Sequence, residues 1–180
     1  MSIAENIAAV RQQMDQAARE TGRTGADVIL VGASKMNDAA ACQEAIAAGI
    51  DALGENRVQE MTAKRAENAY AGRPLHFIGH LQRNKVRKAL EYFTLIHAVD
   101  SLRLARFMDI VAQETGKRPR ILLEVNVGNE DSKFGFFPET LEKEWPELSS
   151  LNHLEIAGLM CIPPPVENPE EARPYFRRLR

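Results

Sequence analysis

Six short apolar runs, separated by stretches with helical patterning, constrain the fold of this 180-residue chain more than any other feature. The runs begin at about residues 28, 51, 75, 94, 120 and 154, so successive runs start about 19 to 34 residues apart. This spacing is typical of a strand followed by a helix. Strict alternation of strands and helices predicts a parallel sheet with helices outside it.

Local signals support this pattern. Ser2 and Glu5 form a capping box, which predicts a helix that continues to about Ala17. The run Val28–Ser34 has almost no polar side chain, which is typical of a parallel strand buried on both faces. The other strands are expected at 51–54, 75–78, 94–99, 120–127 and 154–162. The other helices are expected at 38–49, with Asn37 or Asp38 as the N-cap, at 58–70, 84–92 and 102–116, from 138 onward and from 170 to 180.

Two α/β architectures fit six strand-helix units. A closed (β/α)8 TIM-type barrel typically needs about 250 residues, so this chain would be a barrel truncated after its sixth unit. An open doubly wound sheet fits the length, but no Gly-x-Gly-x-x-Gly follows any predicted strand. We expect residues 1–180 to form a single barrel domain that is incomplete at its C-terminal end. Without two further units, the first and sixth strands would each expose a row of unpaired backbone groups along one side. Such strand edges pair with other chains, so we also expect this chain to self-associate.

Charge and hydropathy exclude several classes of protein. The chain has 23 basic and 25 acidic residues, so no overall basic field would attract nucleic acid or an anionic membrane. No apolar run approaches the roughly 18 residues of a membrane span, and the N-terminus lacks the pattern of a secretory signal. Cys42 and Cys161 lie far apart and predict reduced thiols in a cytoplasmic protein.

Lys35 is the first candidate for chemistry, because ligands bind at the carboxyl ends of parallel strands. A lysine at this position is expected at the mouth of the barrel, partly removed from water, which favours the neutral amine that a Schiff base requires. The small residues 32–34 leave space for a flat ring. A lysine that only extends to solvent is the alternative. Lys133, in a polar loop after the fifth strand, is a second amine that we expect to be solvated.

Two further patterns have simpler explanations. His76 and His80 are four residues apart, but they lie across a strand end and a turn, so we predict no metal site. The basic run at 83–88 has no interleaved aromatic residue, which favours a solvated helix face over a nucleic-acid surface.

Five segments, in order along the chain, resemble motifs of the pyridoxal phosphate homeostasis protein family. They are Val31–Lys35 (family AVSK), Leu53–Glu60 (FGENYVQE), His76–Lys85 (HFIGxLQxNK), Ser132–Gly135 (SKxG) and Gly158–Pro163 (GLMxIP). The resemblance implies a barrel like the N-terminal domain of alanine racemase. It also implies pyridoxal 5'-phosphate held as a Schiff base on Lys35, with Asn56 and Met160 lining the ring pocket.

The family pattern continues beyond the last residue, Arg180, with strands that bear SMGMS and RxGxxxFG. The resemblance implies that those segments supply most of the phosphate cradle, which agrees with the use of the last two strand-helix loops in barrel phosphate sites. Full-length members are expected to be monomeric.

Two functions remain open. The first is a protein of intracellular cofactor homeostasis that binds pyridoxal 5'-phosphate without catalysis, and the alternative is an amino-acid racemase-like enzyme that depends on this cofactor. Racemases of the related fold need an acid-base pair, part of which is a tyrosine from a second domain. Tyr70, Tyr92 and Tyr175 all lie in predicted helices, so we expect a carrier and predict no catalytic residue.

Overall fold

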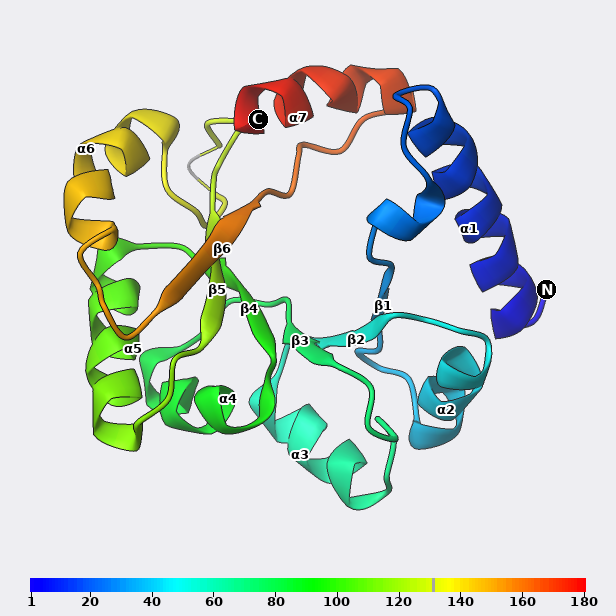
Figure 1. Cartoon of the computed structure of the whole chain (residues 1–180), viewed down its shortest axis with the longest axis horizontal. Helices are drawn as coiled ribbons and strands as arrows, with labels where there is room; N and C mark the ends of the chain where they lie inside the picture. Colours follow the sequence, from blue (N-terminus) through cyan, green and yellow to red (C-terminus); the bar gives the residue numbers. More distant parts are fainter. Residues whose placement is uncertain (131) are drawn as a thin grey trace. The chain divides into compact units, whose positions relative to one another are not determined.

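The computed structural model describes residues 1–130 and 132–180, and it confirms the predicted alternation of strands and helices (Figure 1). The elements are α1 (Ile3–Arg19), β1 (Val31–Ala33), α2 (Ala39–Ala47), β2 (Ala52–Glu55), α3 (Val58–Ala66), β3 (Leu75–Phe77), α4 (Val86–Tyr92), β4 (Leu95–Val99), α5 (Leu102–Thr115), β5 (Arg120–Glu124), α6 (Pro138–Leu148), β6 (Glu155–Met160) and α7 (Arg173–Leu179). The strand order is β1-β2-β3-β4-β5-β6. The chain divides into two compact units, Met1–His76 and Phe77–Arg180. The single domain over 1–180 therefore stays a prediction.

The first unit begins with the predicted capping box. The Ser2 Oγ accepts a hydrogen bond from the Glu5 N–H, and the Glu5 carboxylate accepts one of 2.7 Å from the Ser2 N–H. Helix α1 packs against α2, whose N-cap is Asp38, as the sequence suggests. Strands β1 and β2 pair in parallel, with Ala33 opposite Gly54. This register determines which residues meet beyond the two strand ends.

Strand β1 is shorter and more exposed than predicted. Only Val31–Ala33 is strand, and the side chain of Ile29 in the preceding segment is 67% exposed. Within the described part of the chain, β1 stands at the end of the strand order and pairs only with β2. The prediction of a strand buried on both faces is therefore wrong, because an apolar run is buried only where neighbours cover it.

Helix α3 also ends earlier than predicted. It stops at Ala66 instead of Tyr70, and Asn68 then adopts a left-handed φ of 57° while the Ala69 N–H bonds to the Lys64 carbonyl. Asparagine tolerates this conformation and ends helices in this way. Tyr70 is consequently a buried turn residue, so its predicted helical position is wrong.

The second unit is built on the parallel strands β4, β5 and β6. Its core contains fully buried aliphatic side chains from strands and helices, among them Ile96, Met108, Ile121 and Leu123. Helix α5 packs against α4 and α6 and ends at Gly116, as predicted. The expected last helix is divided into a 3-10 turn at Pro169–Ala172 and α7. No helix among the described residues is long and apolar enough to cross a membrane.

The loop after β5 returns onto the strand end through Gly135. The Phe136 N–H donates to the Glu124 carbonyl at 2.7 Å, and the Asn126 N–H donates to the Phe136 carbonyl at 2.9 Å. Gly135 adopts a φ of 110°, and a Cβ there would lie 2.9 Å from the Asn126 nitrogen. Backbone strain and close approach therefore both require glycine here.

We expect Gly135→Ala to destabilise the protein more than Gly116→Ala. Gly116 also has a left-handed φ, of 64°, but a Cβ there would meet nothing within 4 Å. Its replacement should cost only the conformational strain, about 1–2 kcal/mol. Gly135→Ala adds a collision with backbone that cannot move without breaking the loop. Urea unfolding of both variants measures the difference, and equal losses would contradict the role of close approach.

Candidate functional site

The parallel register brings the ends of β1 and β2 to one edge of the first unit. Ala33 lies opposite Gly54, so Lys35 and Asn56 each follow their strand at two residues beyond this pair. The Ser34 N–H extends the pairing by donating to the Gly54 carbonyl at 2.9 Å. Two of the three residues predicted to bind a cofactor therefore lie at neighbouring strand ends.

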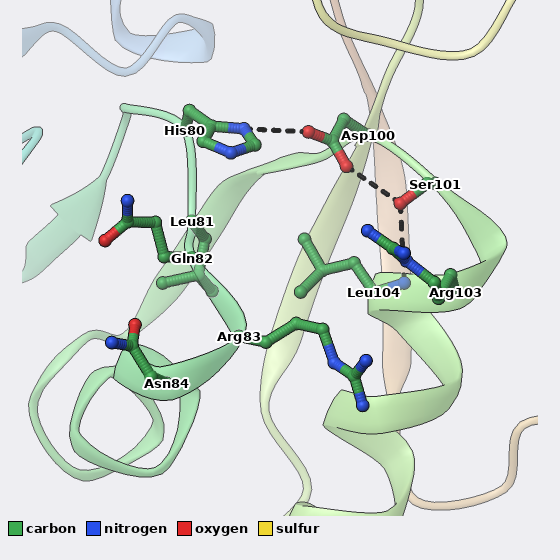
Figure 2. A pocket seen from close by; sticks show the side chains of 9 residues that line it. All are labelled: His80, Leu81, Gln82, Arg83, Asn84, Asp100, Ser101, Arg103 and Leu104. Atoms are coloured by element: carbon green, nitrogen blue, oxygen red, sulfur yellow. Dashed lines mark hydrogen bonds and ion pairs between the residues drawn. The ribbon is translucent and has the colours of Figure 1, made fainter.

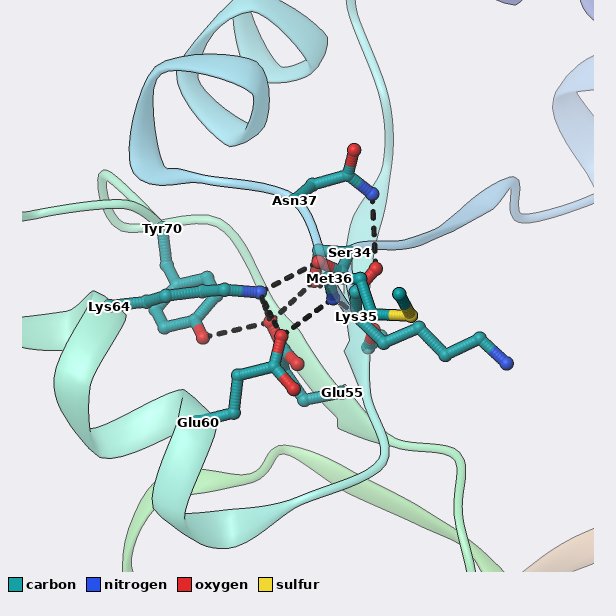
Figure 3. Close-up of polar contacts among 9 residues, drawn as sticks. Ser34, Lys35, Met36, Asn37, Glu55, Glu60, Lys64 and Tyr70 are labelled. Atoms are coloured by element: carbon teal, nitrogen blue, oxygen red, sulfur yellow. Dashed lines mark hydrogen bonds and ion pairs between the residues drawn. The ribbon is translucent and has the colours of Figure 1, made fainter.

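Lys35 lies in the turn after β1, and its side chain is exposed (Figure 3). Its amine extends away from the buried polar groups beneath the turn, and it has no hydrogen-bond or ion-pair partner in the described structure. The expectation of an amine partly removed from water is not met here, because Lys35 follows the last strand residue instead of ending the strand. The amine is nevertheless available to a ligand.

Asn56 offers a second unfilled group at the same edge. Its side-chain Oδ1 is buried and has no hydrogen-bond partner among the residues described. A buried polar atom without a partner is costly and calls for an explanation such as a ligand. The residues present thus fit a small molecule that reacts with the Lys35 amine and fills the hydrogen-bonding capacity of Asn56.

Met160 belongs to the second unit. It is the last residue of β6, half-buried, and its carbonyl accepts a 2.8 Å hydrogen bond from the Val125 N–H. Its place in a ring pocket stays a prediction. The prediction that Lys133 is a solvated loop lysine is wrong. Its side chain is half-buried, and its ammonium lies 2.7 Å from Glu130 and donates to the Pro163 carbonyl. Its amine is therefore engaged.

A buried polar network under Lys35 was missed by the sequence analysis (Figure 3). The Glu55 side chain is fully buried at the end of β2, and its Oε1 accepts hydrogen bonds from Ser34, Lys64 and Tyr70 at 2.8, 2.8 and 3.1 Å. The Lys64 ammonium also pairs with Glu60 at 2.8 Å. Glu60 and Lys64 are four residues apart on helix α3, whose Val58 and Met61 are buried. Oppositely charged residues at this spacing form ion pairs on a helix, so the spacing could have predicted this pair from the sequence.

The network fixes the protonation of its members. Burial alone lowers the pKa of Lys64, but the hydrogen bonds that Lys64 donates to Glu55 and Glu60 outweigh burial, so the net pKa is raised and Lys64 stays an ammonium. The hydrogen bond from Lys64 lowers the pKa of Glu60. Burial, and then the charge of Glu55, raise the pKa of the Tyr70 phenol. Tyr70 therefore remains protonated.

A polar pocket of about 410 Å³ lies in the second unit (Figure 2). His80 Nδ1 lies 2.9 Å from Asp100 Oδ2, and the Ser101 hydroxyl donates to Asp100 Oδ1 at 2.9 Å. The same hydroxyl accepts from the Leu104 N–H and so caps α5. Because Asp100 stands between the other two residues and Ser101 is a helix cap, this chain of hydrogen bonds does not form an activated nucleophile.

Comparison with known proteins assigns the family. The sequence pattern of the family described as "Alanine racemase, N-terminal domain" matches residues 2–180. The chain is 37% identical over 180 residues to the pyridoxal phosphate homeostasis protein of Aquifex aeolicus, covering 100% of this chain and 79% of that protein. It is 41% identical to the Pseudomonas aeruginosa protein of the same name, covering 99% and 78%. The chain belongs to the pyridoxal phosphate homeostasis protein family.

Solved structures agree with this assignment. PipY of Synechococcus elongatus without pyridoxal phosphate matches with a TM-score of 0.85 at 40% identity, covering 99% of this chain and 79% of PipY. The form with the cofactor bound matches with a TM-score of 0.82 at 38% identity, covering 99% and 78%. Alanine racemase of Clostridium difficile matches with a TM-score of 0.66 at 16% identity, covering 85% and 42%. The last likeness shows the fold alone, and it confirms the predicted barrel-type α/β fold of this homeostasis family member.

Glu124 provides a test of the electrostatics in the second unit. It is buried at the end of β5; burial raises its pKa above the ordinary 4.5, the charge of Asp100 raises it further, and His80 opposes the change. The folded protein thus holds this proton to a higher pH than the unfolded chain does. The free energy of unfolding must then fall as the pH rises from about 4.5 through the raised pKa.

We expect Glu124→Gln to raise the free energy of unfolding at pH 7, because an amide carries no charge to desolvate. Below about pH 4 the difference from the parent should vanish, since both side chains are then neutral. Urea unfolding at both pH values measures this. The exposed Glu142 provides a control in Glu142→Gln, which should change little at either pH. A loss of stability at pH 7 for Glu124→Gln would contradict the sign of the effect.

Proposed function

We propose that this chain binds pyridoxal 5'-phosphate as a Schiff base on Lys35 and serves the homeostasis of this cofactor in the cytoplasm, without catalytic turnover. The proposal rests on one observation, that the partnerless amine of Lys35 and the unfilled Oδ1 of Asn56 belong to residues that follow neighbouring strand ends. It includes no nucleic-acid or membrane partner, since the net charge is -2.

The environments of two other lysines, Lys64 and Lys133, make them poorer candidates than Lys35. Lys64 is held as an ammonium by two carboxylates, and Lys133 is paired with Glu130. An ammonium has no lone pair with which to attack a carbonyl, so a paired lysine is a poor nucleophile. A bond formed at the Lys35 amine would break no ion pair among the residues that the structure describes.

The proposed bond would form by condensation of an amine with an aldehyde. Lys35 Nζ would hold the cofactor through a carbon-nitrogen double bond to its aldehyde carbon, with the two amine hydrogens and the aldehyde oxygen released as water. When bound, pyridoxal phosphate supplies the electron sink of its chemistry, and the protein contributes binding and orientation. The Asn56 amide would hydrogen-bond a polar group of the ring.

The relatives support the same ligand. Several of them carry the name pyridoxal phosphate homeostasis protein, and PipY has been solved with pyridoxal phosphate bound. A racemase-like activity is the second candidate, and Tyr70 argues against it. An acid-base catalyst needs a pKa near the working pH, whereas the Tyr70 phenol is buried, bonded to Glu55 and held protonated.

Lys35 should carry the cofactor after reduction. Borohydride converts the carbon-nitrogen double bond into a stable secondary amine, so peptide mapping should find the pyridoxyl mass on the Lys35 peptide. Lys35→Ala should abolish this adduct and leave the fold intact, because an exposed side chain in a turn makes few packing contacts. Lys88→Ala, an exposed lysine on α4, is the matched control and should label normally. A label on Lys133 or Lys85 instead would refute the assignment.

Cofactor-loaded protein should not racemise amino acids. The amine of Lys35 can serve as one acid-base group, but racemisation needs a second one, and Tyr70 is buried, bonded to Glu55 and held protonated. Exchange of the α-hydrogen in deuterium oxide, followed by NMR for a panel of free amino acids, measures this directly. A turnover in the ordinary enzymatic range of about 1–1,000 per second would favour the racemase alternative.

A further inference from the structure

The turn that carries Lys35 has an uncommon backbone conformation. Met36 adopts a left-handed φ of 62°, and the Asn37 N–H closes the turn by donating to the Ser34 carbonyl at 3.0 Å. Residues with a Cβ adopt a positive φ only where the surroundings hold them there. The direction of the Lys35 side chain therefore depends on whatever holds Ser34 and Met36.

Helix α3 supplies contacts on both sides of Lys35. The Lys64 ammonium donates to the Ser34 carbonyl at 2.7 Å, and Glu60 Oε1 accepts from the Met36 N–H at 2.7 Å. The two side chains lie one helical turn apart and bond to each other at 2.8 Å (Figure 3). One ion pair on a helix thus holds the residue before Lys35 and the residue after it.

The contacts of Lys64 are buried and anchored by Glu55, whereas the contact between Glu60 and the Met36 N–H is exposed. The side chain of Lys64 is 10% exposed and that of Glu60 is 25% exposed. Glu55, fully buried, bonds to Lys64 at 2.8 Å and to the Ser34 hydroxyl at 2.8 Å. Hydrogen bonds to charged groups are stronger than neutral ones, and low exposure protects those of Lys64 from competing water. This arrangement resists reorientation of the turn.

We propose that Glu60 and Lys64 are positioning residues for Lys35, which fix the backbone on either side of it and so aim its amine at the cofactor. The inference depends on the proposed Schiff base at Lys35. Neither residue touches the cofactor in this proposal. Their effect passes through the Ser34 carbonyl and the Met36 N–H.

The test uses the whole chain with three variants of α3. Glu60→Ala removes the acceptor for the Met36 N–H, while Glu60→Gln keeps an oxygen there without the charge. Glu67→Ala, at the exposed C-terminal end of the same helix, is the matched control. Lys64→Met is a poorer probe, because it would leave the carboxylate of Glu55 buried without its cation.

Three quantities are measured for each protein: the dissociation constant for pyridoxal phosphate from its visible absorbance, the share of pyridoxyl label on Lys35 after borohydride reduction, and the urea midpoint without cofactor. We expect Glu60→Ala to bind about tenfold more weakly, as the loss of one charge-assisted hydrogen bond implies. Its Lys35 share of label should fall relative to surface lysines. Glu60→Gln should lose about two- to threefold, and Glu67→Ala should match the parent.

The share of label separates aiming from stability, since a merely less stable protein that is folded at the assay temperature would still label Lys35 preferentially. Unchanged affinity and unchanged share in folded Glu60→Ala overturn the positioning role while the Schiff base on Lys35 stands. If Glu60→Ala does not fold, the same decision falls to Glu60→Gln, whose parent-like values would overturn it. A parent protein that does not label at Lys35 refutes the proposed function itself.

Discussion

The buried ion pair between Glu55 and Lys64 is the interaction on which the first unit depends. It joins the end of β2 to helix α3, and through Ser34 it reaches the end of β1. Desolvating two charges is expensive, so such a pair adds little net stability, yet removing one partner leaves an uncompensated buried charge. The pair therefore specifies how the three elements meet more than it strengthens their packing.

This arrangement gives two nearby lysines different roles. Lys64 is buried between carboxylates and keeps its proton, whereas Lys35 is exposed and without a partner in the described residues. Of these two amines, only that of Lys35 is open to reaction with an aldehyde cofactor. The fold shared with alanine racemase at 16% identity does not decide this chemistry, because function depends on the site and not on the barrel.

Much of the fold was readable from local signals. The capping box at Ser2 and the helix end at Gly116 were predicted and lie where the sequence indicates, and Asp38 is the N-cap out of the two predicted residues, Asn37 and Asp38. The same holds for the neighbouring positions of Lys35 and Asn56, since parallel strands with regular spacing bring their carboxyl ends to one edge. The length of the strand before Lys35 was overestimated, because an apolar run does not show whether the strand will have a neighbour on each side.

The sequence by itself determined the order of strands and helices, their caps and the two polar residues at adjacent strand ends, because these follow from signals a few residues apart. Only the tertiary structure decided that Lys64 reaches the carbonyl of Ser34, thirty residues earlier, and that Tyr70 leaves the helix to bond Glu55. It also decided that the Lys35 amine is exposed. These features depend on packing between distant segments. A charged group that packing buries must be paired, and no local sequence pattern shows which groups will be buried.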